Sequence, residues 1–235
     1  MLDFKKLFSK IEYFNKEKIT SNDLANTPEN IAMRTFLDSP TPELTENLDN
    51  CEYLAVDIET TGLSSNKDTI LSIGFVPINR RCIDLSQAQH FYVKTQVSVG
   101  ESATIHNIKD SDIQTKGQAI EDVMTSLLKA LSGRVLLVHY ANLDYSFLNI
   151  ACKKLYGIPL QCQVIDTLQV EKRRLLRENP NHAPTLRLDD CRQNYNLPRY
   201  SAHNALTDAL ATAELWVAQM AVLQENSPIQ LKEYC

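Results

Sequence analysis

Glycine is scarce in this sequence, at 6 of 235 residues. This shortage argues strongly against the glycine-rich loops with which many nucleotide-binding proteins hold phosphate groups. None of the 6 cysteines forms a C-x-x-C pair, so no zinc site is expected. We expect reduced thiols in a cytoplasmic protein instead. The longest aliphatic run, 135–138, is far below the roughly 20 apolar residues of a membrane span, so none is expected. The N-terminus also lacks the features of a secretory signal.

Basic charge is in short supply as well. The formal net charge is −5, whereas proteins that hold long duplex DNA on their own surface are usually basic. The balance is uneven along the chain, because residues 21–60 carry a net charge of −8 and residues 171–200 carry +3. Hydrophobic residues make up 43% of the chain, which supplies a sizeable core and excludes a fully disordered protein.

The first 50 residues form a predicted helical N-terminal extension. Residues 1–18 contain an apolar stripe at helical spacing. The stripe consists of Phe4, Leu7, Phe8, Ile11 and Phe14. Two Thr-Pro-Glu triplets, 27–29 and 41–43, have the sequence of helix N-termini. The stripe has no core of its own to enter, so we expect this extension to dock on the following domain, on a second copy or partner protein, or on a membrane surface.

An α/β domain is predicted for residues 51–225, followed by a C-terminal tail at 226–235. The expected strands are 53–58, 69–78, 90–97, 135–138 and 163–165. The clearest expected helices are 120–131, 143–156 and 205–223. Three strands followed by alternating helices and strands indicate a mixed five-stranded sheet flanked by helices.

Asp57 and Glu59 form the first candidate constellation. Residues i and i+2 of a strand project to the same side, so both carboxylates should emerge together at the strand end. Ligands commonly bind at such ends in open α/β sheets. Two carboxylates without a soft ligand nearby suit Mg²⁺ or Mn²⁺. Because D-x-E is a common pattern, an ordinary polar strand terminus is the alternative on these two residues alone.

Two further constellations lie at predicted helix starts. Asp144 follows strand 135–138 and sits in the first turn of a helix, where an acid also simply favours the helix dipole. His203 precedes the last long helix, and Asp208 lies about one turn inside it, next to its apolar face. An unpaired carboxylate there is costly, and a metal would offset the cost. A partly exposed acid at the helix entry is the alternative.

Together these motifs resemble those of the DEDDh group of 3′–5′ exonucleases, which includes the proofreading epsilon subunit of bacterial DNA polymerase III, RNase T and oligoribonuclease. Residues 56–63 read VDIETTGL, and residues 139–148 are similar to the family motif H-N-x-x-F-D-x-x-F-L. His203 and Asp208 match H-x-x-x-x-D. A sister group of these exonucleases has Tyr four residues before the last Asp of this motif. Asn204 holds that position here, so the form of the motif with His203 applies.

This resemblance covers about residues 50–223 and implies an RNase H-like fold. The sequence departs from the family at two places in the second motif. Tyr140 occupies a position usually taken by Asn, and Leu143 one usually taken by Phe. Neither position is a metal ligand in the family, so the departures bear on substrate packing more than on catalysis.

The resemblance implies a metal-dependent 3′–5′ exonuclease that releases nucleoside monophosphates from single-stranded or frayed DNA 3′ ends, in proofreading or repair. It implies two Mg²⁺ or Mn²⁺ ions per site. The implied metal ligands are Asp57, Glu59, Asp144 and Asp208, with Asp57 shared between the ions. His203 would complete the five catalytic residues by taking the proton of the attacking water, since imidazole titrates near neutral pH.

Implied substrate contacts are Thr60, Thr61 and Leu63, with Leu63 packing on the terminal base. His106 is a further implied contact, although a plain turn histidine explains it equally well. The expected partners are nucleic-acid 3′ ends and, through the N-terminal extension, either a partner protein or a second copy of this chain. An enzyme that trims RNA 3′ ends is one alternative, and a non-catalytic adaptor with the same fold is another. The sequence leaves open the preference for DNA or RNA and any membership of a polymerase complex.

Overall fold

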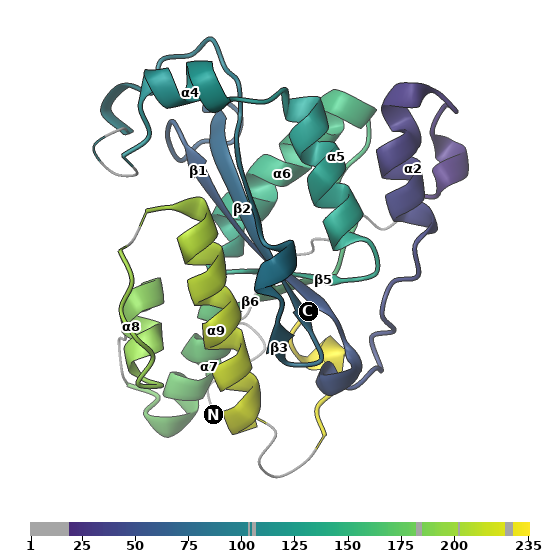
Figure 1. The fold of residues 1–235 in the computed structure, drawn as a ribbon. Helices are drawn as coiled ribbons and strands as arrows, with labels where there is room; N and C mark the ends of the chain where they lie inside the picture. Colours follow the sequence, from purple (N-terminus) through teal and green to yellow (C-terminus); the bar gives the residue numbers. More distant parts are fainter. Residues whose placement is uncertain (1–18, 103, 105–106, 182–184, 202, 224–227) are drawn as a thin grey trace.

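A mixed β-sheet lies at the centre of the protein, with helices on both faces (Figure 1). The computed structural model describes residues 19–102, 104, 107–181, 185–201, 203–223 and 228–235. The apolar stripe predicted in 1–18 and the candidate contact His106 lie outside these residues. Within them, the sheet has six strands in the order β3-β2-β1-β5-β6, and β4 also pairs with β2. Their bounds are β1 Tyr53–Thr60, β2 Ile70–Asn79, β3 Cys82–Ile83, β4 Gln89–Tyr92, β5 Val135–Val138 and β6 Val164–Asp166.

The sheet confirms the mixed α/β expectation and adds one short strand to it. β2 is antiparallel to β1, β3 and β4, whereas β5 is parallel to β1 and to β6. The unexpected strand, β3, forms a hairpin with β2 through Arg80 and Arg81, whose φ angles are 48° and 66°. Such two-residue turns usually contain Asn-Gly or another dipeptide with glycine. The Arg-Arg sequence therefore did not predict a hairpin.

The third predicted strand, 90–97, is shorter in the structure. β4 ends at Tyr92. The following residue, Val93, still donates its amide to the carbonyl of Leu71 in β2 and forms an isolated bridge with Gln118. Residues 95–98 then leave the sheet, and the amide of Val97 binds the hydroxyl of Thr95 instead of a strand. The alternation of apolar and polar side chains continues past the end of the strand, so the predicted strand was longer than the observed one.

Two layers of helices cover the sheet (Figure 1). α5 (Ile120–Leu131) and α6 (Ala141–Tyr156) lie on one face, and α9 (Ala205–Leu223) lies on the other. The remaining α-helices are α2 (Ile31–Asp38), α4 (Asp110–Lys116), α7 (Thr167–Glu178) and α8 (Leu188–Gln193). α2 packs against α5, whereas α7 and α8 pack against α9. The three long helices predicted from the sequence are thus present, and α6 begins two residues earlier than expected.

The apolar side chains of β1 alternate between two cores, as the period of a strand requires. Leu54 and Val56 belong to the core under α5 and α6. Tyr53 and Ala55 belong to the core under α9, where the ring of Tyr53 meets Trp216 edge-on at a centroid distance of 5.4 Å. The alternation continues along β1 and places Asp57 on the α9 side of the sheet.

α9 is the one helix among the described residues that is long and apolar enough to cross a membrane, judged by length and composition alone. Its side chains Ala213, Trp216 and Met220 are fully buried in the core beneath it. The apolar composition of α9 is accounted for by this packing, which is that of a core helix.

The described part of the N-terminal extension enters both cores. Met33 and Phe36 of α2 join the core under α5 and α6, and Leu48 joins the core under α9. Met33 and Leu48 have no exposed surface. Residues 19–50 therefore bury apolar side chains against the α/β domain, which is one of the three docking targets expected for the extension.

The second Thr-Pro-Glu triplet, 41–43, does not begin a helix, contrary to the prediction. The following residues instead pair with the C-terminal tail: Lys232 donates to the carbonyl of Leu44, and Leu231 donates to the carbonyl of Glu46. The carbonyl of Pro42 accepts a hydrogen bond from the side chain of Gln163. These partners satisfy the backbone around a turn in which the amide of Glu46 donates to the carbonyl of Glu43, and no local sequence signal predicts them.

Candidate active site

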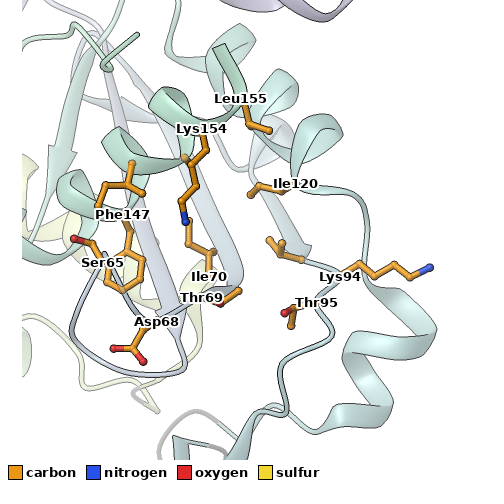
Figure 2. A pocket seen from close by; sticks show the side chains of 13 residues that line it. Ser65, Asp68, Thr69, Ile70, Lys94, Thr95, Ile120, Phe147, Lys154 and Leu155 are labelled. Atoms are coloured by element: carbon orange, nitrogen blue, oxygen red, sulfur yellow. The ribbon is translucent and has the colours of Figure 1, made fainter. Parts of the chain in front are cut away.

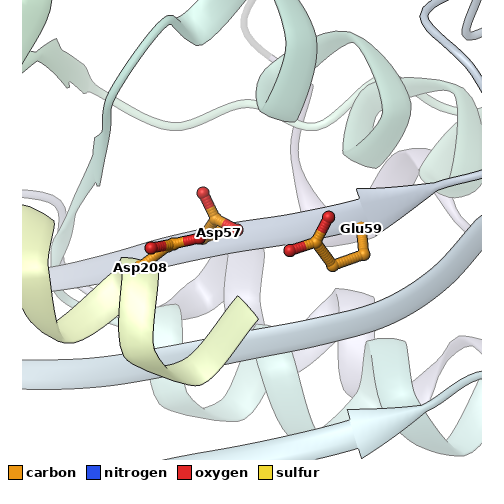
Figure 3. A group of neighbouring side chains, drawn as sticks. All are labelled: Asp57, Glu59 and Asp208. Atoms are coloured by element: carbon orange, nitrogen blue, oxygen red, sulfur yellow. The ribbon is translucent and has the colours of Figure 1, made fainter. Parts of the chain in front are cut away.

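Three carboxylates converge at the end of β1 (Figure 3). Asp57 and Glu59 project to the same side of β1, and Asp208 reaches them from the first turn of α9. One carboxylate oxygen from each of the three lies within 4.8 Å of the others. The structure therefore brings together three of the four metal ligands implied by the sequence.

Asp144, the fourth, approaches β1 from the first turn of α6. Its side chain is almost fully buried, with 2% of its surface exposed. One of its oxygens accepts a hydrogen bond from the amide of Ile58, between the two β1 carboxylates, at 3.2 Å. Its charge raises the pKa of Asp57. Asp144 thus lies next to the group of three carboxylates, but its oxygens are not among those that lie within 4.8 Å of one another.

The carboxylates hold their protons more tightly than ordinary acids. Burial, followed by the charge of Asp208, raises the pKa of Glu59 to about 7. Burial raises the pKa of Asp57 well above its usual range, and the charges of Asp144, Asp208 and Glu59 raise it further. Burial also raises the pKa of Asp208. A cation between these groups would relieve both the burial cost and the mutual repulsion.

The donor set fits a hard divalent cation. Its three closest groups offer oxygen only, and no cysteine or second type of ligand is grouped with them among the described residues. Mg²⁺ and Mn²⁺ prefer such carboxylate oxygens. The chemistry of the residues therefore agrees with the metal implied by the sequence motifs.

His203 lies at the entrance of α9, in the left-handed backbone conformation with φ 68°. This conformation turns its amide back toward the helix, where it donates to Oδ2 of Asp208 at 2.8 Å. The residue is exposed, and it lines the same cavity as Asp57 and Asp208. The backbone of His203 therefore orients a carboxylate, while its imidazole is left accessible to a ligand.

The cavity over the carboxylates has a volume of about 950 Å³. It is lined by Asp57, Leu63, His139, Tyr140, Arg187, Leu188, Asp189, Asp190, Arg199, His203 and Asp208. Arg187 and Arg199 belong to no motif of the sequence that predicts a role in this site. The sequence did show a net positive charge over residues 171–200. This charge alone does not indicate which basic side chains of the segment face a site.

The three predicted contacts in the β1–β2 loop are placed differently from one another. Leu63 is 84% exposed and lines the cavity. The hydroxyl of Thr60 donates to the carbonyl of Gly62, and the hydroxyl of Thr61 accepts from the amide of Thr69. Both threonine side chains therefore shape the loop, and of the three side chains only Leu63 projects into the cavity.

A second cavity lies on the other side of this loop, against α5 and α6 (Figure 2). It has a volume of about 200 Å³ and a largely apolar wall that includes Ile70, Ile120 and Phe147. Lys154 of α6 extends over it. No close group of three metal-binding side chains lines it among the described residues. It is therefore a feature separate from the carboxylate site.

Comparisons with known proteins identify the family of the chain. The profile of the RNase T exonuclease family matches residues 54–216. The PolC-type DNA polymerase III of Caldanaerobacter subterraneus subsp. tengcongensis is 33% identical over 175 residues, which cover 74% of this chain but only 12% of that relative. The DNA polymerase III epsilon subunit of Treponema pallidum is 28% identical over 169 residues, which cover 72% of this chain and 76% of that protein.

Solved structures of exonucleases share the fold. Escherichia coli exonuclease I, in a zinc-bound complex with single-stranded DNA, superposes with a TM-score of 0.64 at 16% identity, over 75% of this chain and 42% of that one. Cell-death related nuclease 4 gives a TM-score of 0.61 at 17% identity, over 73% and 64% of the two chains. With the family match over most of the chain, these findings show that the protein belongs to the RNase T exonuclease family, the DEDDh 3′–5′ exonucleases.

Proposed function

We propose that this protein is a metal-dependent 3′–5′ exonuclease that releases nucleoside monophosphates from single-stranded or frayed DNA ends. The observation that carries the proposal is the convergence of Asp57, Glu59 and Asp208, whose oxygens lie within 4.8 Å of one another despite their like charge. The similarity to DNA polymerase III chains supports a role in proofreading or repair. Structures of exonuclease I with oligonucleotides support single-stranded DNA as the substrate.

The proposed cofactor is a pair of Mg²⁺ or Mn²⁺ ions. Asp57 would be shared between them, Glu59 and Asp208 would bind one, and Asp144 would support the other. Bound ions of this kind supply an activated water and neutralise charge on the scissile phosphate. The raised pKa values of Asp57 and Glu59 support this assignment, because a cation would favour their ionised forms.

His203 is the proposed general base. Its ring is exposed in the cavity beside Asp208, so a ring nitrogen can accept the proton of the attacking water. The hydrogen bond from the His203 amide to Asp208 uses the backbone only, so it does not occupy the ring nitrogen that would accept the proton. Asp208 is therefore oriented by the same residue that would remove the proton.

The proposed contacts for the terminal nucleotide are the loop residues Thr60, Thr61 and Leu63. Leu63 would pack on its base, and the loop backbone would contact its sugar. We further propose that the N-terminal extension, residues 1–50, lies outside the catalytic unit of 51–225. Because residues 19–50 pack on the domain itself, docking on a partner or on a second copy would fall to residues 1–18. The cytoplasmic location expected from the sequence belongs to the same proposal.

The direct test uses oligonucleotides with a label at the 5′ end, incubated with Mn²⁺ or Mg²⁺ and compared with an EDTA control. We expect a ladder that shortens from the 3′ end, together with free nucleoside monophosphates. Single-stranded and recessed DNA ends and matched RNA oligonucleotides are compared in parallel. Faster cleavage of RNA would favour the trimming enzyme, and the absence of metal-dependent cleavage on every substrate would favour the adaptor.

A further inference from the structure

Tyr140, at the rim of the active-site cavity, has an unfavourable backbone conformation. Its φ of 80° and ψ of 65° lie in the left-handed region, which bulky residues rarely adopt and which Asn adopts several-fold more often. The carboxylate of Asp166 holds the backbone there by accepting hydrogen bonds from the amides of Tyr140 and Ala141, at 3.0 and 3.1 Å. Strain of this kind persists where the surroundings fix it, and it commonly marks functional sites.

The ring of Tyr140 is not used in the core. The residue is 49% exposed and lines the cavity that contains Asp57 and Asp208. The register of β5 on β1 pairs Leu137 with Ala55, so Tyr140 lies beside the part of β1 that carries the carboxylates. Leu63, by contrast, lies beyond the end of β1. The two exposed large hydrophobic side chains of the cavity therefore come from two separate segments of the chain, one after β1 and one after β5.

Arg187 is the cation that accompanies Tyr140. It immediately precedes α8, is exposed, and lines the same cavity. No ion pair involves it among the described residues, whereas Arg199, the other arginine of the cavity, pairs with Asp189 at 3.1 Å. His139, the residue before Tyr140, contacts the carbonyl of Leu186 through Nε2 at 2.9 Å. This contact joins the backbone segments that carry the two side chains.

The cavity is large enough for more than the nucleotide that is removed. Its volume of about 950 Å³ lies near the upper end of the roughly 300–1,000 Å³ of ligand pockets. The carboxylates would face the scissile phosphate, and Leu63 would contact the terminal base. The strand on the 5′ side of that phosphate must then leave along another part of the cavity, where Tyr140 offers an aromatic face and Arg187 a guanidinium with no ion pair in the described part of the chain.

We propose that Tyr140 and Arg187 form a subsite for the nucleotide on the 5′ side of the scissile phosphate. The ring of Tyr140 stacks on its base, and the guanidinium of Arg187 binds its phosphate. Aromatic stacking and phosphate contacts are the usual means of holding single strands without sequence preference. The proposal rests on the exonuclease function proposed above, and it concerns substrate positioning rather than the chemical step.

Two substrates separate this subsite from the catalytic centre. One is a single-stranded DNA oligonucleotide, and the other is the 4-nitrophenyl ester of thymidine 5′-monophosphate, which has one scissile phosphate and no nucleotide on its 5′ side. For Tyr140→Asn, which keeps a residue suited to the left-handed backbone, kcat/KM on the oligonucleotide should fall about 5- to 100-fold relative to the ester. Tyr140→Phe should restore the ratio, because it keeps the ring.

Arg187→Ala is tested by the salt dependence of binding, measured by fluorescence anisotropy of a labelled oligonucleotide in Ca²⁺. Losing one phosphate contact should lower the slope of log Kd against log salt concentration by about 0.7. Lys154→Ala is the matched control, since Lys154 lies at the second cavity and has no ion pair among the described residues (Figure 2). Its slope should equal that of the wild type.

Each outcome decides the proposal. If Tyr140→Asn lowers kcat/KM equally on both substrates, or on neither, Tyr140 does not bind a nucleotide beyond the scissile phosphate. An unchanged slope in Arg187→Ala, or an equal change in Lys154→Ala, would contradict a specific phosphate contact. A wild-type protein that cleaves neither substrate would instead refute the exonuclease function itself.

Discussion

The backbone of Ala205, at the start of α9, lies directly over Gly74 of β2. A Cβ on Gly74 would stand well within 3.0 Å of that backbone, a distance that real Cβ atoms do not show. Gly74 is also the residue paired with Asp57 in the β1–β2 register. The missing side chain therefore lets α9 approach β1 closely enough for Asp208 to reach Asp57.

Gly74→Ala should accordingly reduce nuclease activity more than stability alone explains. The added methyl group displaces the start of α9 and with it Asp208, and a shift of about 1 Å at a catalytic site can cost roughly 10²-fold in rate. The measurement is kcat at a temperature where the variant remains folded. Gly157→Ala is the control, because Gly157 has φ 75° but no neighbour within 4 Å of its Cβ position. A Gly74 variant with wild-type kcat would show that the close approach is not needed.

Asp57→Asn and Asp208→Asn should each abolish nuclease activity without lowering the stability of the metal-free protein. Both substitutions keep the shape of the side chain and remove one of several repelling buried charges. Thermal unfolding in EDTA checks stability, and 3′-end release in Mn²⁺ checks activity. Asp122→Asn, at an exposed acid of α5, should leave both unchanged. Near-wild-type turnover of either site variant at saturating Mg²⁺ would remove that residue from the metal site.

The metal-free protein should become less stable as pH rises from about 4.5 to 7. Glu59 has a pKa of about 7 in the folded protein against 4.5 for an ordinary Glu, so the folded state binds more protons in this interval. The stability contributed by Glu59 is therefore fully present below pH 4.5 and is lost as pH rises through about 7. The free energy of unfolding should fall by about 2–3 kcal/mol because of this group. Unfolding in EDTA across this range measures the effect. Saturating Mn²⁺ should flatten the dependence, and a stability that rises over the same interval would contradict the assignment.

Much of this site was predictable from the sequence, because its residues sit in motifs with local signals. Asp57 and Glu59 follow from strand period, and Asp208 from its place beside an apolar helix face. Arg187 and the strained backbone of Tyr140 were not predictable in the same way. Their positions depend on contacts across the fold, from His139 to Leu186 and from Asp166 to Tyr140.

The same distinction explains the fold. Helix 120–131 was predicted with its observed bounds, since its apolar face has a clear 3.6-residue period. The hairpin at Arg80 and Arg81 and the non-helical segment after Pro42 were not predicted. The first depends on a turn with atypical residues, and the second on hydrogen bonds with the C-terminal tail, nearly 190 positions away.

His203→Asn should lower the hydrolysis rate at neutral pH by roughly 10²–10⁴-fold, the usual contribution of a general base. Asn tolerates the left-handed backbone of this position, so the amide hydrogen bond to Asp208 should persist. Metal affinity, measured by Mn²⁺ titration, should therefore stay close to that of the wild type. A large loss of affinity together with a normal rate at saturating metal would make His203 a ligand instead of a base.

Two truncated chains test the N-terminal extension. A chain that begins at residue 48 loses Met33 and Phe36 from the core and the pairing of Leu44 with Lys232. Truncating one such buried side chain typically costs about 2–5 kcal/mol, so this chain should unfold at a markedly lower temperature. A chain that begins at residue 19 keeps all of these contacts. It should retain the melting temperature of the described fold and change only in oligomeric state or partner binding.

Both truncated chains should still hydrolyse short oligonucleotides while folded, because no residue of 19–50 lines the carboxylate cavity. Circular dichroism establishes the folded range, and kcat/KM is compared within it. Size-exclusion chromatography with light scattering reports the oligomeric state of each chain. A chain from residue 48 as stable as the full protein would contradict the packing of Met33 and Phe36. A folded chain from residue 19 without activity would place residues 1–18 in the active site, because every catalytic residue proposed here remains present in it.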